Sequence, residues 1–140
     1  MIKVSRDTSD ATRCTIRVRD HAITADVAAG EGGGDAGPDP HDLYDAALGA
    51  CKALTMIWYA NRRGIALGNV EVRVERDASQ EREGTYRLRT EVRLDGDLDA
   101  RTRDDLLRVA TKCPVHKLMR EVETQIETIA VPRVGAAERP

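Results

Sequence analysis

The fold is decided by the stretch PHDLYDAALGACKALTMIWYANRRG, residues 40–64, whose middle is apolar on nearly every side. Pro40 is well placed in a first helical turn, where its missing N–H group is not needed, and Gly64 is a typical helix stop. We therefore expect one long helix from about His41 to Arg63. Because a helix that is apolar nearly all round is buried on most sides, one face of it is expected to need a second subunit.

Strands are predicted on both sides of this helix by strict alternation of apolar and polar residues. The pattern occurs at residues 14–18, 23–27, 70–75 and 86–94, with a further short strand at 2–4. Residues 125–131 are expected to form a last strand. Residues 19–21 are expected to form or adjoin a hairpin turn between the first two of these strands.

The rest of the chain is punctuated by glycine, proline and a helix cap. Residues 30–40 are rich in glycine and proline and predict a loop. Asp99 is a suitable N-cap for a second helix, Cys113-Pro114 breaks it, and a short third helix reaches about Val122. Strands, a long helix, strands, helices and a last strand indicate an α+β fold with antiparallel sheets.

Composition limits the class of protein. The 140 residues suit one domain, which we place at 1–131, followed by a loose tail at 132–140. A net charge of −2 argues against a nucleic-acid binder, and charged residues within 43–60 argue against a membrane span. The N-terminus does not resemble a signal peptide, and three cysteines do not suggest a disulfide framework. We therefore predict a cytoplasmic protein.

Two cysteines occupy positions that affect a thiolate in opposite ways. Cys113 precedes Pro114 and so lies at a helix N-terminus, where free N–H groups and the helix dipole favour a thiolate. Cys51 lies in the middle of the apolar helix, where burial disfavours the thiolate unless a cation such as Arg17 or Arg19 is near. The alternative is that both are simply small buried residues.

The remaining thiol and the histidines carry weaker signals. Cys14 shares a strand face with apolar residues and is expected in the core. Cys113 and His116 have the spacing of two ligands on one helix face, but a closed zinc site needs four, and His21 and His41 are isolated. We therefore predict no metal and no bound cofactor. His116 is left either as a surface residue or as one that orients a cysteine or caps the helix.

Two segments resemble the cysteine motifs of the OsmC/Ohr family, the osmotically induced and organic hydroperoxide resistance proteins. Residues 37–51, GPDPHDLYDAALGAC, resemble the first motif, and 112–117, KCPVHK, resemble the second. Residues 25–38 and 96–99 are similar to the OsmC-like branch, and the similarity spans about 14–131.

This resemblance implies an intertwined homodimer with a long central helix in each subunit and active sites at the interface. It also implies that Cys51 attacks a hydroperoxide and becomes a sulfenic acid, which Cys113 resolves to a disulfide. An external lipoyl-type dithiol would then reduce the pair. Arg19 would be the cation that activates Cys51, with Arg17 as the alternative. Asp42 stands near the position where peroxidase members carry a glutamate, one methylene longer.

Two other functions stay open at this point. A non-catalytic dimer that binds a small ligand would keep the fold and an apolar pocket, and the Asp42 departure motivates it. A thiol redox sensor or oxidoreductase acting on proteins is the third option, although the chain has no Cys-x-x-Cys motif.

Overall fold

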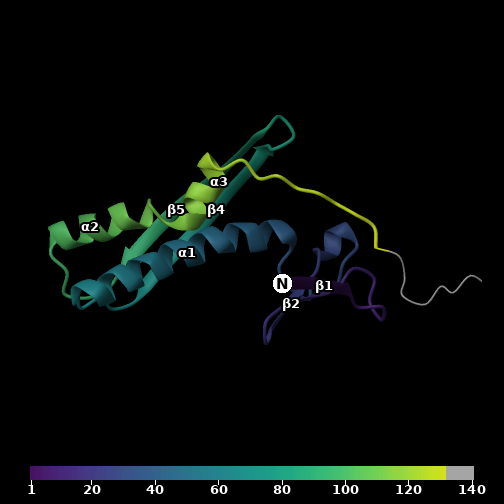
Figure 1. Ribbon diagram of the computed structural model, residues 1–140, viewed down its shortest axis with the longest axis horizontal. Helices are drawn as coiled ribbons and strands as arrows, with labels where there is room; N and C mark the ends of the chain where they lie inside the picture. Colours follow the sequence, from purple (N-terminus) through teal and green to yellow (C-terminus); the bar gives the residue numbers. More distant parts are fainter. Residues whose placement is uncertain (132–140) are drawn as a thin grey trace, which may run out of the picture.

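The computed structural model describes residues 1–131 as two antiparallel sheets around one long helix (Figure 1). The elements are β1 (Ile2–Arg6), β2 (Cys14–Val18), β3 (His21–Ala25), the 3₁₀ turn η1 (Ala29–Glu31), α1 (Pro40–Arg63), β4 (Val70–Gln80), β5 (Thr85–Leu94), α2 (Ala100–Ala110) and α3 (Pro114–Glu121). The predicted α+β class is confirmed. Among residues 1–131, no helix combines the length and the apolar character needed to cross a membrane.

Both ends of α1 are fixed by local hydrogen bonds. Asp39 is the N-cap. Its carboxylate accepts a hydrogen bond from the backbone N–H of Asp42, and the Asp42 carboxylate accepts one from the backbone N–H of Asp39, which is a capping box. Pro40 occupies the first turn, as predicted. Gly64 ends the helix with φ of 64°, a left-handed conformation that glycine adopts without strain, and its N–H donates to the Ala60 carbonyl. The helix is therefore confirmed to within one residue of the predicted bounds.

The core lies where one face of α1 meets β4, β5 and α2 (Figure 1). Its buried members are Met56, Ala60, Leu94, Leu106 and Ala110. Gly49 lets α1 approach the sheet closely, since a Cβ atom there would lie 3.0 Å from a methyl group of Val74.

The opposite face of α1 is uncovered in the single chain. Leu54 and Trp58 are 64% and 59% exposed, and Ile57 is exposed as well. The expectation that this helix is buried on most sides therefore holds for one face only.

The three-stranded sheet lies beyond the N-terminal end of α1, away from the β4–β5 hairpin (Figure 1). β2 pairs with β1 on one side and with β3 on the other, all antiparallel. The predicted turn between β2 and β3 is confirmed, with Arg19 in a left-handed conformation at φ 54°. Ile2, Val4 and Ile23 are exposed, so this sheet covers little apolar surface of its own chain.

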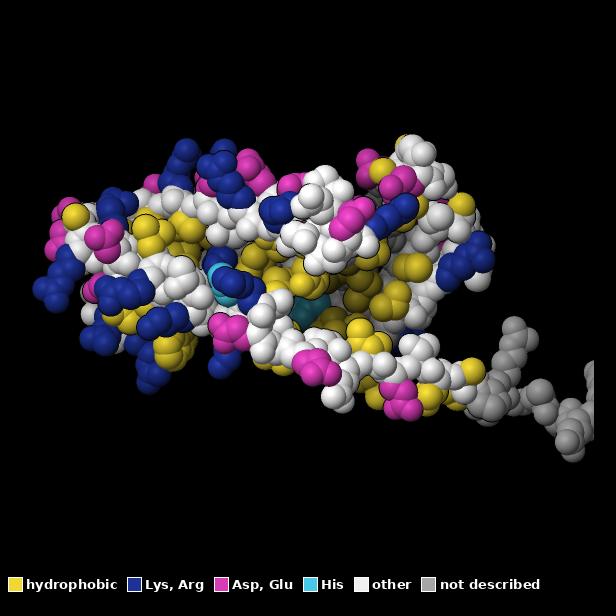
Figure 2. All heavy atoms as spheres, turned by 90° about the horizontal axis from the view of Figure 1, so that it is seen from above, with side chains coloured by type: hydrophobic (Ala, Val, Ile, Leu, Met, Phe, Trp, Pro, Cys, Tyr) yellow, Lys and Arg dark blue, Asp and Glu magenta, His cyan; other side chains and the backbone are white. Residues whose placement is uncertain are grey.

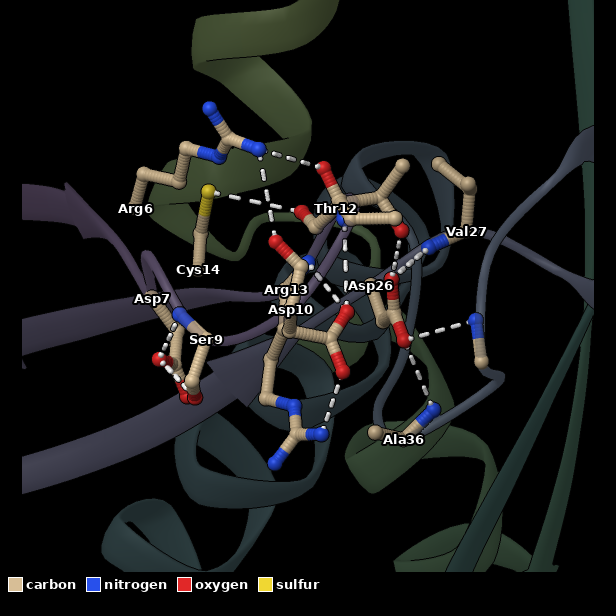
Figure 3. Close-up of polar contacts among 12 residues, drawn as sticks. Arg6, Asp7, Ser9, Asp10, Thr12, Arg13, Cys14, Asp26, Val27 and Ala36 are labelled. Carbon is tan, nitrogen blue, oxygen red and sulfur yellow. Dashed lines mark hydrogen bonds and ion pairs between the residues drawn. The ribbon is translucent and has the colours of Figure 1, made fainter.

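The loop before α1 is organised around one buried carboxylate (Figure 3). Asp26 accepts hydrogen bonds from the Thr12 hydroxyl at 2.5 Å and from the backbone N–H groups of Val27, Gly34 and Ala36 at 2.9, 3.1 and 3.1 Å. These hydrogen bonds, led by the one from Thr12, lower the pKa of Asp26 to about 2. The hydrogen bonds to Asp26 therefore hold this loop in place.

The predicted last strand at 125–131 is wrong. The structure has no strand between α3 and residue 131, and Ile126, Ile129 and Val131 are 72% to 84% exposed. Its isoleucine and valine residues favour a strand, but this stretch pairs with no strand of the described chain. The predicted loose tail, 132–140, lies outside the described residues.

Replacing Asp26 by Asn is expected to lower the melting temperature at neutral pH by several degrees, because a neutral amide cannot accept all four hydrogen bonds. Stabilisation by a carboxylate whose folded-state pKa is depressed is complete above its ordinary value of 3.8 and is lost as the pH falls toward 2. Melting curves of Asp26→Asn should therefore depend less on pH between about 5 and 2 than those of the parent protein. The exposed Asp20, in the β2–β3 turn, provides the matched control Asp20→Asn. Equal acid dependence of Asp26→Asn and the parent would refute this account of the loop.

Candidate functional site

Cys51 and Cys113 meet at the N-terminus of α3, although they come from different elements. The Sγ atom of Cys51, on α1, accepts a hydrogen bond from the backbone N–H of Val115 at 3.5 Å. The Sγ atom of Cys113, the N-cap of α3, accepts from the backbone N–H of His116 at 3.4 Å. These N–H groups belong to consecutive residues of the first helical turn, where backbone donors have no partner within the helix. One helix end therefore holds both sulfur atoms.

Both thiols are reduced, and their exposure differs. Cys113 has no exposed surface, whereas Cys51 is partly exposed. Burial raises the pKa of Cys113, and the neighbouring Cys51 raises it further, while the His116 N–H and Lys52 act in the opposite direction. Cys113 is therefore protonated at neutral pH, and its S–H can donate to the Cys51 sulfur.

A buried lysine lies beside this pair. Lys52 follows Cys51 on α1, is 4% exposed, and donates from Nζ to the carbonyl of Ala110 at 3.1 Å and to Nδ1 of His116 at 3.2 Å. Burial, and then the positive charge of Lys52, lower the pKa of His116, which is neutral at pH 7. Since Nδ1 accepts this hydrogen bond, we assign the imidazole proton to Nε2.

Lys52 is thus the part of the site that sequence reasoning missed, and with it the contact between Lys52 and His116. His116 is half-buried and in contact with Lys52, so it is not an isolated surface residue. A lysine inside an otherwise apolar helix was the signal that could have pointed to this group, because a buried lysine needs hydrogen-bond partners.

A cleft of about 560 Å³ opens next to these groups. Its walls are formed by α1, β5 and α3, and Lys52 and His116 are among its lining residues; the others are Tyr44, Leu48, Gly84, Tyr86, Leu88, Thr90, Met119 and Arg120. Figure 2 shows apolar side chains gathered in a hollow on one face of the molecule, with charged side chains around it. The chain thus has room for a small molecule beside Lys52 and His116, which lie next to the thiol pair.

The predicted cations lie elsewhere in the single chain. Arg19 is exposed in the β2–β3 turn, and Arg17 is exposed on β2. Within residues 1–131, neither guanidinium forms a hydrogen bond or an ion pair with Cys51 or Cys113. One chain therefore brings the two predicted cysteines together without a predicted arginine.

Asp42 is engaged by a residue that the sequence did not single out. Its carboxylate pairs with Arg76 of β4, whose Nε also lies 3.0 Å from Asp45. The Tyr86 hydroxyl donates to Asp45 at 2.9 Å, and burial, helped by Asp45, raises the pKa of Tyr86 to about 12, so this hydroxyl remains a donor. The cluster ties the first turns of α1 to the β4–β5 hairpin, with Asp42 facing Arg76 and not Arg19.

The other thiol and the histidines form no metal centre in the described chain. Cys14 is partly buried on β2, and its thiol lies 3.7 Å from the carbonyl oxygen of Thr12. No group of three or more His, Cys, Asp or Glu side chains in residues 1–131 is placed to hold a metal ion.

The difference in exposure predicts an order of thiol reactivity. Iodoacetamide should modify Cys51 at least roughly tenfold faster than Cys113 in the native reduced protein, because Cys113 is buried and its pKa is raised. Peptide mass mapping over time measures both rates in one sample. In denaturant the two rates should become similar, which controls for differences between the peptides. Equal rates in the native protein would contradict the described environment of Cys113.

Comparison with solved structures places the fold among known ones. An OsmC-like protein from Mycoplasma pneumoniae superposes with a TM-score of 0.71 at 17% identity, covering 87% of each chain. The organic hydroperoxide resistance protein OhrB of Bacillus subtilis gives 0.58 at 22% identity, covering 86% of this chain and 91% of that one. An organic hydroperoxide resistance protein OsmC from Legionella pneumophila gives 0.61 at 18%, covering 86% and 90%.

Sequence comparison supplies the family. No curated protein matches the sequence. The family model described as OsmC-like protein matches residues 32–128, a range that includes α1, both sheet strands of the hairpin, α2 and α3. The match covers most of the chain and contains both cysteines of the site. The chain therefore belongs to the OsmC-like protein family.

Proposed function

We propose that this protein is a thiol-dependent peroxidase that reduces organic hydroperoxides, with Cys51 as the attacking thiol and Cys113 as the resolving thiol. The observation that carries the proposal is the placement of both sulfur atoms on consecutive N–H groups of one helix end. Family membership and structural neighbours named hydroperoxide resistance proteins support a role connected with peroxides.

The two thiols suit different steps of such a reaction. In the first step the Cys51 thiolate attacks the terminal oxygen of the hydroperoxide, the O–O bond breaks, the alkoxide takes a proton and leaves as an alcohol, and Cys51 becomes a sulfenic acid. In the second, the Cys113 sulfur attacks the Cys51 sulfur, hydroxide leaves with a proton as water, and a disulfide forms. An external dithiol of the lipoyl type then reduces the disulfide by exchange.

The local geometry supports these different roles of the two thiols. Cys51 is the more accessible thiol, as the attacking residue must be, while Cys113 is buried and protonated until it is used. The first turn of α3 supplies hydrogen-bond donors and a partial positive charge where negative charge develops on sulfur.

We further propose that the working form is a homodimer. The uncovered face of α1, the exposed apolar residues of the β1–β3 sheet and the exposed apolar residues of 125–131 are surfaces that a second copy would cover. In such a dimer, Arg19 or Arg17 would reach the thiol pair of the partner subunit, because neither arginine reaches the pair of its own chain. The Asp42 carboxylate would then hold Arg76 and not the activating arginine.

Cysteine variants test the peroxidase function directly. With cumene hydroperoxide as substrate and dihydrolipoamide as reductant, Cys51→Ser should reduce turnover to background, because no sulfenic acid can form. Cys113→Ser should react once and then stall, with a sulfenic acid on Cys51 that a dimedone probe traps. Cys14→Ser is the matched control and should keep the parent rate, since Cys14 lies on β2, outside the pair. Parent-like turnover by Cys51→Ser would contradict the proposal, and background turnover in the parent itself would favour a ligand-binding role for the cleft.

A further inference from the structure

Lys52 is a buried charge without a matching carboxylate. Its Nζ contacts one backbone carbonyl and one neutral imidazole, and within residues 1–131 no Asp or Glu forms an ion pair with it. The titratable and charged groups around it are Cys51 and Asp45 on its own helix, Cys113, His116, Arg120 and the exposed Glu121 at α3, and Tyr86 on β5. Asp45 is already engaged by Arg76 and Tyr86.

A buried cation is costly unless a nearby group carries or develops negative charge. Tyr86 remains protonated, and Arg120 and His116 carry no negative charge. Glu121, whose charge acts on His116, is exposed to solvent, so the groups within the site that can become anionic are the sulfur atoms of Cys51 and Cys113. The positive charge of Lys52 already acts on Cys113, where it opposes the effect of burial.

The position of Lys52 has a second, structural aspect. Ala110 is the last residue of α2, so the bond from Nζ to its carbonyl places a cation at the negative end of that helix. At the start of α3, Nδ1 of His116 accepts a hydrogen bond from the same ammonium group. Lys52 thus bridges the break between α2 and α3, and Cys113 stands at this break. A role confined to capping α2 would involve the Ala110 carbonyl but would not require the ammonium group to act on the thiols.

We infer that Lys52 is a positioning residue for the thiol pair: its ammonium group, held by Ala110 and His116, is a buried counter-charge that stabilises the anionic form of Cys51 and Cys113. The inference rests on the proposed function for its purpose, but the charge effect is a property of the reduced protein alone. It also gives each subunit a cation of its own at the thiols, independent of any arginine from a second copy.

Titration of the thiol pair tests this role. The parent for the test is Cys14→Ser, and the thiolate absorbance in the ultraviolet is followed against pH, with a Cys51→Ser/Cys113→Ser blank to subtract tyrosine ionisation. Lys52→Gln removes the charge but keeps an N–H donor for the Ala110 carbonyl, and Lys52→Arg restores the charge. Lys117→Met removes an exposed lysine of α3, the helix that Cys113 caps, and is the matched control.

We expect Lys52→Gln to raise the midpoint of the first thiolate titration by about one pH unit, the low end for loss of a nearby opposite charge. Lys52→Arg should recover most of this shift, and Lys117→Met should leave the midpoint unchanged. An unchanged midpoint in Lys52→Gln, in a protein with a parent-like melting curve, would overturn the inference and leave Lys52 as a helix cap only.

Two further outcomes separate this inference from the peroxidase proposal. If Lys52→Gln does not fold, Lys52→Arg carries the test, and a midpoint raised as far as about one unit despite the retained charge would overturn the inference. Peroxide is absent from the titration, so a raised midpoint supports the role of Lys52 even if the parent shows no turnover. If Lys52→Gln leaves the midpoint unchanged and the parent does reduce hydroperoxide, the role inferred for Lys52 is refuted and the cysteine mechanism stands.

Discussion

The backbone N–H groups of the first turn of α3 are the constraint on which the site depends. A helix start leaves these donors without partners, and here two sulfur atoms take two of them. Pro114 is the first residue of α3, which makes Cys113 the N-cap. Cys51 reaches the same turn only because α1 passes it at close range. The chemistry therefore depends on where one long helix lies against one short one.

The position of α1 is in turn held from both ends and from one side. The capping box and Gly64 define its length, and Gly49 lets it approach β4. The cluster of Arg76 with Asp42 and Asp45 fixes its first turns to the hairpin. Farther along, Lys52 links the same helix to the ends of both α2 and α3. Polar contacts thus frame an apolar core and fix the register of Cys51 against α3.

Much of this architecture could be predicted from local pattern. Proline and glycine mark the ends of α1, alternation marks β2, β4 and β5, and Cys113-Pro114 marks the start of α3, because each signal acts within a few residues. The convergence of Cys51 and Cys113 was not visible in these signals and came only from resemblance to a family. The strand prediction at 125–131 failed because residues that favour a strand do not by themselves supply a pairing edge.

Contacts between distant residues account for the rest of what sequence reasoning missed. Nothing near Asp42 in the sequence indicates that Arg76 will neutralise it. In the sequence, Lys52 is only a charged residue within an apolar helix, because its hydrogen-bond partners lie on α2 and α3. Arg19 was assigned from family resemblance, and the single chain leaves it exposed in a turn.

The central claim is that two sulfur atoms on one helix end form a working redox pair, and peptide mapping without reductant measures this most directly. The reduced protein is treated with one equivalent of an organic hydroperoxide, alkylated and digested. Our account predicts a disulfide between Cys51 and Cys113 of the same chain, with Cys14 recovered as a free thiol. Recovery of both Cys51 and Cys113 as free thiols after the hydroperoxide has been consumed, or their pairing with other cysteines, would contradict it.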